Sequence, residues 1–129
     1  MADNGADFTL TFRRLCGAAA AAEGDAGVRS LFADPGAFDE WAARWRLRLA
    51  REGGEPGMRK AAMRLANPAF IPRNHRVEEA IAAAYKSDLA PFDTLLQVLS
   101  APYEDQPAFE RYADPPGPHE VVRETFCGT

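Results

Sequence analysis

Apolar residues recur along most of the chain at the three- and four-residue spacing that marks one face of a helix. The clearest run begins at Asp34, a favourable N-cap. Pro35 suits the first helical position, where its missing N–H costs nothing, and Gly53 with Gly54 ends the pattern. For the tryptophan pair of this run a binding surface is the alternative, but we favour an inward-facing stripe of Phe38, Trp41, Trp45 and Leu49.

The same spacing predicts further helices over residues 7–22, 26–33, 57–66, 74–86 and 88–99. Asn67 before Pro68 stops one of them, because a residue that precedes proline disfavours helical geometry. We therefore expect a mostly α fold, an irregular multi-helix bundle over residues 1–100. The residues expected to face inward are Phe8, Phe12, Leu15, Ala19, Val28, Leu31, Phe32, Met58, Ala62, Leu65, Val77, Ile81, either Ala84 or Tyr85, Phe92, Leu95, Leu96 and Leu99.

The pattern changes after Ser100, where five prolines fall within a short span. This density disfavours a helix and favours an extended, polyproline-like path. Residues 101–129 are thus expected to form a proline-rich extended tail that ends in Cys127. Aromatic residues should pin the tail to the helical body: Tyr103, Phe109 and Tyr112.

Composition narrows the classes of function. The chain has 129 residues and a net charge of −4, which argues against a nucleic-acid partner because such proteins usually carry a basic balance. No apolar run reaches the length of a membrane span, and residues 1–5 carry no signal sequence, so a cytoplasmic protein without a membrane partner is expected. Cys16 and Cys127 form no metal-ligand spacing, and no metal site is expected.

The densest polar cluster is Arg73-Asn74-His75-Arg76, which lies between a proline and a predicted helix. A helix N-terminus can hold an anion. We favour the alternative, in which Asn74 caps the helix and hydrogen bonds fix the turn. The arginines of the 34–53 helix are likewise more typical of a solvated, salt-bridged face than of an anion site, because acidic residues accompany them.

Catalytic signatures do not emerge from the sequence. It has no glycine-rich phosphate loop and no nucleophile elbow, so no catalytic or cofactor-binding residue is assigned within the chain. Cys127 lies third from the C-terminus. An exposed thiol there can react with an oxidant, and an incidental free thiol is an equal alternative.

Several motifs, taken in order, resemble the C-terminal region of the SelO family, whose members have a protein-kinase-like (pseudokinase) fold and transfer AMP to proteins. They are Asp7-Phe8-Thr9-Leu10, Phe12-Arg13, Phe38-Asp39-Glu40-Trp41, Asn67-Pro68, Arg73-Asn74, Glu78-Glu79-Ala80-Ile81, Pro102-Tyr103 with Gln106-Pro107, Tyr112 with Pro115-Pro116, and Cys127.

The resemblance implies that the chain is a fragment of a larger kinase-like protein. That parent is an adenylyltransferase that binds ATP with magnesium or manganese and modifies Ser, Thr or Tyr hydroxyls of protein substrates. Its catalytic and nucleotide-binding residues lie upstream, so the chain alone is not expected to be an enzyme. The helices would brace the upstream kinase-like core, and Cys127 would be a redox-regulatory thiol.

Two consequences separate this reading from its alternative, a free-standing helical interaction module without catalysis. A fragment should expose an apolar patch that faced the missing core, most of all on the helices over 8–19 and 38–49. In the parent, Cys127 would form a reversible disulfide with a cysteine of that core.

Overall fold

The computed structural model describes residues 1–123, and Cys127 lies outside the described residues. This part of the chain is mostly helical and contains no strand, which confirms the predicted all-helical class. The chain divides into two compact units, Met1–Pro68 and Ala69–Thr129. None of the helices over residues 1–123 is long and apolar enough to cross a membrane.

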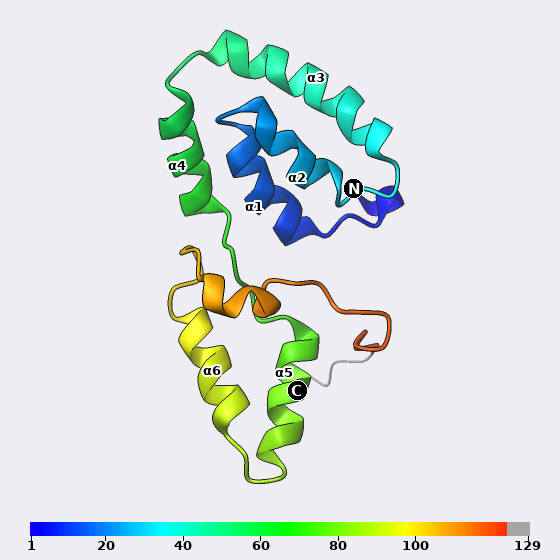
Figure 1. Ribbon diagram of the computed structural model, residues 1–129, viewed down its shortest axis with the longest axis vertical. Helices are drawn as coiled ribbons and strands as arrows, with labels where there is room; N and C mark the ends of the chain where they lie inside the picture. The colour runs from blue at the N-terminus through cyan, green and yellow to red at the C-terminus, as the bar shows by residue number, and fades with distance from the viewer. Residues whose placement is uncertain (124–129) are drawn as a thin grey trace, which may run out of the picture. The chain divides into compact units, whose positions relative to one another are not determined.

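The first unit is built from six helical segments, which Figure 1 shows in blue to green. The helix α1 packs against both α2 and α4, and α3 runs alongside α2. The short 3-10 helices η1 and η2 precede α1 and α2. Their bounds are η1 Ala2–Asn4, α1 Phe8–Ala18, η2 Ala22–Gly24, α2 Asp25–Arg29, α3 Pro35–Glu52 and α4 Pro56–Ala66.

Acidic side chains begin the three longer helices of this unit. Asp7 Oδ1 accepts from the N–H of Leu10 at 2.8 Å, and Asp34 Oδ1 accepts from the N–H of Gly36 at 2.9 Å. Glu55 caps α4 in the same way. At the other end of α3, Gly53 has a φ of 64°, which a residue without Cβ adopts at no steric cost. Both predicted ends of α3 are therefore confirmed.

The core of the first unit gathers between α1, α2 and α3. Its buried residues are Leu15, Ala18, Val28, Phe38 and Ala42, and Phe12, Phe32, Trp45 and Met63 pack against them. The predicted inward faces differ from this core at several residues. Phe8 lies at the open start of α1 and is 69% exposed, while Met58 and Leu65 of α4 are 73% and 77% exposed.

The predicted inward face of α4 is wrong, and the difference has a physical cause. The predicted stripe of Met58, Ala62 and Leu65 lies on the outer side of the helix. The side that faces α1 carries Met63 and the backbone groups that arginine side chains bind. Helical spacing identifies an apolar stripe but does not say which partner covers it.

The second unit consists of α5 (Asn74–Ala84), α6 (Ala90–Leu99) and the 3-10 helix η3 (Pro107–Tyr112). The two α-helices lie side by side, and η3 crosses their upper ends in Figure 1. The buried core is Ala69, Phe70, Ala80, Leu95, Val98 and Tyr112. Val98 is completely buried although it was not on the predicted face, whereas Phe92 and Leu96 are half or more exposed.

The segment after Ser100 belongs to this second unit. The carbonyl of Pro102 accepts from the N–H groups of Ala69 and Phe70, at 2.8 and 3.1 Å. Contrary to the expected extended path, Pro107–Tyr112 is a 3-10 helix, because proline is tolerated in a first turn. Tyr112 is buried as predicted, but Tyr103 is 46% exposed.

Candidate functional site

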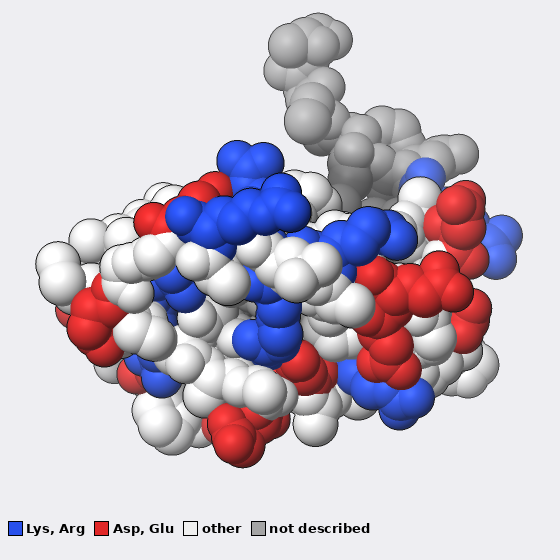
Figure 2. All heavy atoms as spheres, turned by 90° about the horizontal axis from the view of Figure 1, so that it is seen from above, with Lys and Arg blue, Asp and Glu red and all other residues white. Residues whose placement is uncertain are grey.

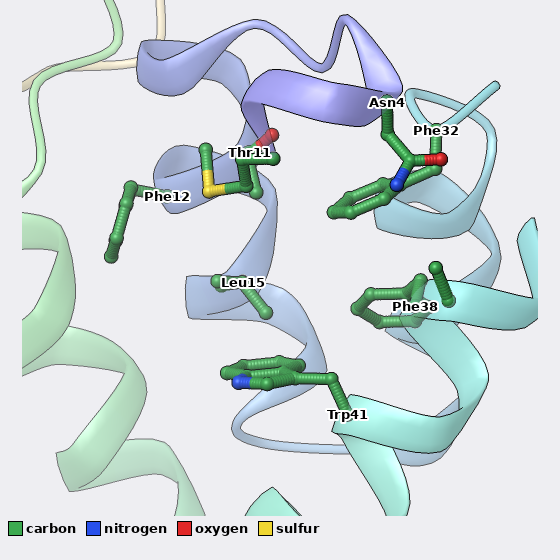
Figure 3. A pocket seen from close by; sticks show the side chains of 9 residues that line it. Asn4, Thr11, Phe12, Leu15, Phe32, Phe38 and Trp41 are labelled. Carbon is green, nitrogen blue, oxygen red and sulfur yellow. The ribbon is translucent and has the colours of Figure 1, made fainter. Parts of the chain in front are cut away.

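An apolar pocket lies in the first unit, between η1, α1 and α3 (Figure 3). Its volume is about 380 Å³. The side chains of Leu15, Phe38 and Trp41 converge on it from α1 and α3, and Asn4 and Phe32 line it beside Phe38. The sequence did not predict this pocket, because its walls come from separate segments that no single periodicity connects.

The polar groups of the pocket already have partners. The hydroxyl of Thr11 donates to the carbonyl of Asp7 at 2.6 Å, and Asn4 Oδ1 accepts from the N–H of Asp34 at 2.8 Å. No nucleophile paired with a base, such as hydrolytic catalysis needs, is found among the residues lining it. The pocket is suited to contact with apolar groups.

The two tryptophans of α3 differ in their surroundings. Their rings stack at 5.1 Å with an interplanar angle of 21°. Trp45 packs against the core, as the inward-facing stripe predicted. Trp41 is 39% exposed and forms part of the pocket wall, so for this residue the surface alternative fits better.

Arginines on and around α3 pair with carboxylates. Arg29 contacts Asp39 at 3.0 Å, and Arg48 contacts Glu52 at 2.8 Å. Arg46 binds Asp25 as well. In Figure 2, which views the molecule from the α3 side, blue side chains gather across the middle of this face and red ones lie around them. The pairs favour a solvated, salt-bridged face over an anion site.

The cluster at residues 73–76 is more buried than the sequence indicated. Arg73, not Asn74, is the N-cap of α5, and it makes no side-chain cap bond, so the predicted capping role of Asn74 is wrong. The backbone enters the helix one residue earlier than the prediction, directly after Pro72. His75 is only 6% exposed, and among the described residues its Nε2 has no hydrogen-bond partner.

The arginines of this cluster tie the following segment to α5. Arg73 Nη2 donates to the carbonyl of Ala113 at 2.7 Å. Arg76 pairs with Glu79 at 2.9 Å and with Glu120 at 3.4 Å. A hydrogen bond from Arg111 lowers the pKa of Glu79, and Arg76 lowers it further. The cations are thus engaged with carboxylates and carbonyls, which favours a structural role.

The burial of His75 predicts a pH-dependent stability. Desolvation is the first cause that lowers its pKa, and the charge of Arg76 adds to it. The folded state then holds the neutral ring, while the unfolded chain takes up a proton near its ordinary pKa of about 6.5. Stability is full above that pKa and falls as the pH drops from it toward the folded value.

Urea unfolding at about pH 7.5 and about pH 5.5, on either side of the ordinary histidine pKa, measures this effect. We expect the midpoint of the wild-type chain to fall on acidification and that of His75→Gln to fall less. His119→Gln is the matched control, because His119 is exposed. Equal pH dependence in wild type and His75→Gln would contradict the assignment.

Cys16 is 1% exposed, and its thiol donates to the carbonyl of Phe12 at 3.3 Å. Burial raises the pKa of this thiol, which leaves little of the reactive thiolate at neutral pH. Among residues 1–123, no group of three or more metal-ligating side chains comes together.

Several residues that carry the family resemblance bind main-chain carbonyls within their own unit. Arg13 Nη1 donates to the carbonyls of Arg64 and Asn67, at 3.3 and 2.9 Å. The side chain of Asn67 donates to the carbonyl of Met63 at 2.7 Å and so caps the end of α4. Gln106 Nε2 donates to carbonyls at the end of α6, at 2.9 and 3.0 Å. Sequence reasoning did not assign the role of Arg13, because its acceptors lie 51 and 54 positions further along the chain.

The comparisons place the chain beside enzymes that transfer nucleotides to proteins, although no family model matches it. The relatives are named protein nucleotidyltransferase YdiU. The one from Nitrobacter winogradskyi is 58% identical over the whole chain, and the one from Rhodopseudomonas palustris strain BisB5 is 60% identical over the whole chain. A Bradyrhizobium relative is 60% identical over 96% of the chain.

The chain spans only about a quarter of the length of these relatives: 26% of the Nitrobacter and Rhodopseudomonas proteins and 25% of the Bradyrhizobium protein. The matching quarter is the C-terminal one. The resemblance to the C-terminal region of the SelO family is thereby confirmed.

Proposed function

We propose that this chain forms the C-terminal structural part of a YdiU-type protein adenylyltransferase. In that reaction a Ser, Thr or Tyr hydroxyl oxygen of a protein attacks the α-phosphorus of ATP; the hydroxyl proton is lost, AMP is transferred and pyrophosphate leaves. ATP, its magnesium or manganese ion and the catalytic residues belong to the upstream portion. The observation that carries the proposal is the match of the whole chain to the C-terminal quarter of named protein nucleotidyltransferases.

Hydrogen bonds made by residues of the family motifs support a bracing role for the chain itself. Arg13, Asn67 and Gln106 each bind main-chain carbonyls at helix ends. Such bonds stabilise a scaffold, because they satisfy groups that a helix end leaves without partners. The chain would therefore act as a rigid C-terminal scaffold that packs against the upstream core.

A chimera that joins the upstream portion of the Nitrobacter winogradskyi relative to this chain tests the function. We expect the chimera to transfer label from α-³²P-ATP to protein, and the upstream portion alone to lose most of that activity. Isothermal titration of the isolated chain with ATP and magnesium should show no saturable binding. Micromolar ATP binding by the isolated chain would contradict the assignment, and an inactive chimera that folds would favour the free-standing module.

The proposal includes a redox role for Cys127. Its thiolate and a cysteine of the upstream core would form a disulfide, with a peroxide as the oxidant that accepts the two electrons and is reduced to water. Mass spectrometry of the chimera after peroxide should find the Cys127 peptide linked to an upstream peptide, and dithiothreitol should release it. Cys16→Ser should leave this link intact. A free Cys127 in both states, or a link to Cys16, would contradict the role.

A further inference from the structure

The apolar pocket of the first unit has the size and chemistry of a docking site. Its volume of about 380 Å³ lies within the roughly 300–1,000 Å³ that is typical of binding pockets. Leu15 and Phe38 form its floor and are part of the buried core, so the pocket cannot close by moving them without opening that core. Trp41 stands at its wall, partly exposed.

The apolar surface continues beyond the pocket. Phe12 lines the pocket, and the ring of Phe8 packs on it with the centroids 4.7 Å apart. Phe8 is 69% exposed. A large aromatic side chain that extends a pocket outward is typical of surface that another segment covers.

The place of Met1 in the pocket and the length of the relatives point to one occupant. Met1 lines this pocket, next to η1. The relatives carry about three quarters of their length before the matched region. Polypeptide that continues backward from Met1 in such a protein must therefore leave from the pocket itself, and its nearest residues can reach Trp41 without a long connection.

Exposed acidic residues are neighbours of the pocket-lining residues Asn4 and Trp41. Asp3 and Asp34 are both exposed. Asp3 precedes Asn4 in the sequence, and the N–H of Asp34 donates to Asn4 Oδ1. Glu40 is exposed next to Trp41. A segment with apolar side chains flanked by basic residues complements this arrangement.

We propose that the pocket receives apolar side chains of the segment that directly precedes Met1 in the longer protein, and so docks the C-terminal scaffold onto the upstream portion. The proposal rests on the proposed function in that it takes the chain as the end of a longer protein. It adds the place of attachment and the residues that form it: Phe8, Phe12, Leu15, Phe38 and Trp41.

A fluorescein-labelled peptide tests the proposal. It covers the residues directly before the matched region of the Nitrobacter winogradskyi relative, about 20 residues, which allows several helical turns. Fluorescence anisotropy should show saturable binding to the wild-type chain. Trp41→Glu places a charge in the pocket wall and Ala37→Phe fills the pocket; each should weaken binding at least tenfold. Tyr85→Glu, on an exposed residue of the second unit, should leave binding unchanged.

Three results would overturn the docking proposal. The first is the absence of saturable binding at millimolar chain concentration, and the second is equal binding by the pocket variants, whose folding is checked by circular dichroism. The third is a dimer that Trp41→Glu abolishes while peptide binding stays the same, since a second copy would then be the occupant. Peptide binding together with a chimera that transfers no nucleotide would reject the proposed function and leave the docking site in place.

Discussion

Truncation of Phe38 to alanine is expected to unfold the first unit of the chain at ordinary temperatures. Phe38 is 2% exposed and sits among Leu15, Val28 and Ala42 in the core. Replacing a buried phenylalanine by alanine lowers the free energy of unfolding by about 3–5 kcal/mol, including the cost of the cavity left behind. Domains are typically stable by about 5–15 kcal/mol, and small ones lie near the lower end, so this loss removes most of the stability.

Circular dichroism with urea unfolding measures the effect of Phe38→Ala. Phe8→Ala is the matched control, because the same side chain is lost from an exposed position on α1. We expect the control to change the unfolding midpoint only slightly. A Phe38→Ala chain that unfolds at the wild-type midpoint would show that the first unit is not held by this core.

Truncation of Tyr112 to alanine is expected to release the segment after Ser100 from the second unit. Tyr112 is 9% exposed, belongs to the core with Val98 and Leu95, and packs against Phe109 with ring centroids 6.2 Å apart. Loss of a buried aromatic side chain costs about 3–5 kcal/mol. Over residues 69–123 the second unit has two α-helices and one 3-10 helix, so this described part has few other contacts to offset that loss.

Limited proteolysis followed by mass spectrometry reads this release directly. We expect the rate of cleavage within residues 103–123 to rise at least tenfold in Tyr112→Ala. Tyr85→Ala removes the same side chain from a position that is 88% exposed and should cleave at the wild-type rate. Equal rates in both variants would mean that other bonds, such as those of Gln106, suffice to hold the segment.

Local signals explain what the sequence predicted well. Both ends of α3 follow from residues within a few positions of them: the Asp34 carboxylate at its start and Gly53 at its end. The packing of Tyr112 was expected from the aromatic residues that accompany the prolines after Ser100. A capping residue acts on neighbouring N–H groups, so its effect does not depend on the rest of the fold.

The features that the sequence did not predict depend on distant partners. The α4 stripe of Met58 and Leu65 has ordinary helical spacing, yet it faces outward. The completely buried Val98 lies two residues after Leu96, which was expected to be buried and is 59% exposed. The pocket joins Met1 and Asn4 to α1 and α3, and no pattern along the chain connects these segments. Periodicity gives the direction of a stripe, while tertiary packing decides which stripe is covered.

Arginine side chains close the C-terminal ends of all three longer helices in the first unit. Arg13 binds carbonyls at the end of α4, Arg46 and Arg59 bind those of Ala18 and Ala19 at the end of α1, and Arg59 also reaches Leu49 and Gly53 at the end of α3. The planar guanidinium can serve carbonyls of two helices at once, which a lysine ammonium on a single stem does poorly. The preference of this sequence for arginine over lysine therefore has a structural consequence: arginine side chains connect helix ends. Because the acceptors are uncharged carbonyls, added salt should weaken these hydrogen bonds less than it weakens exposed ion pairs.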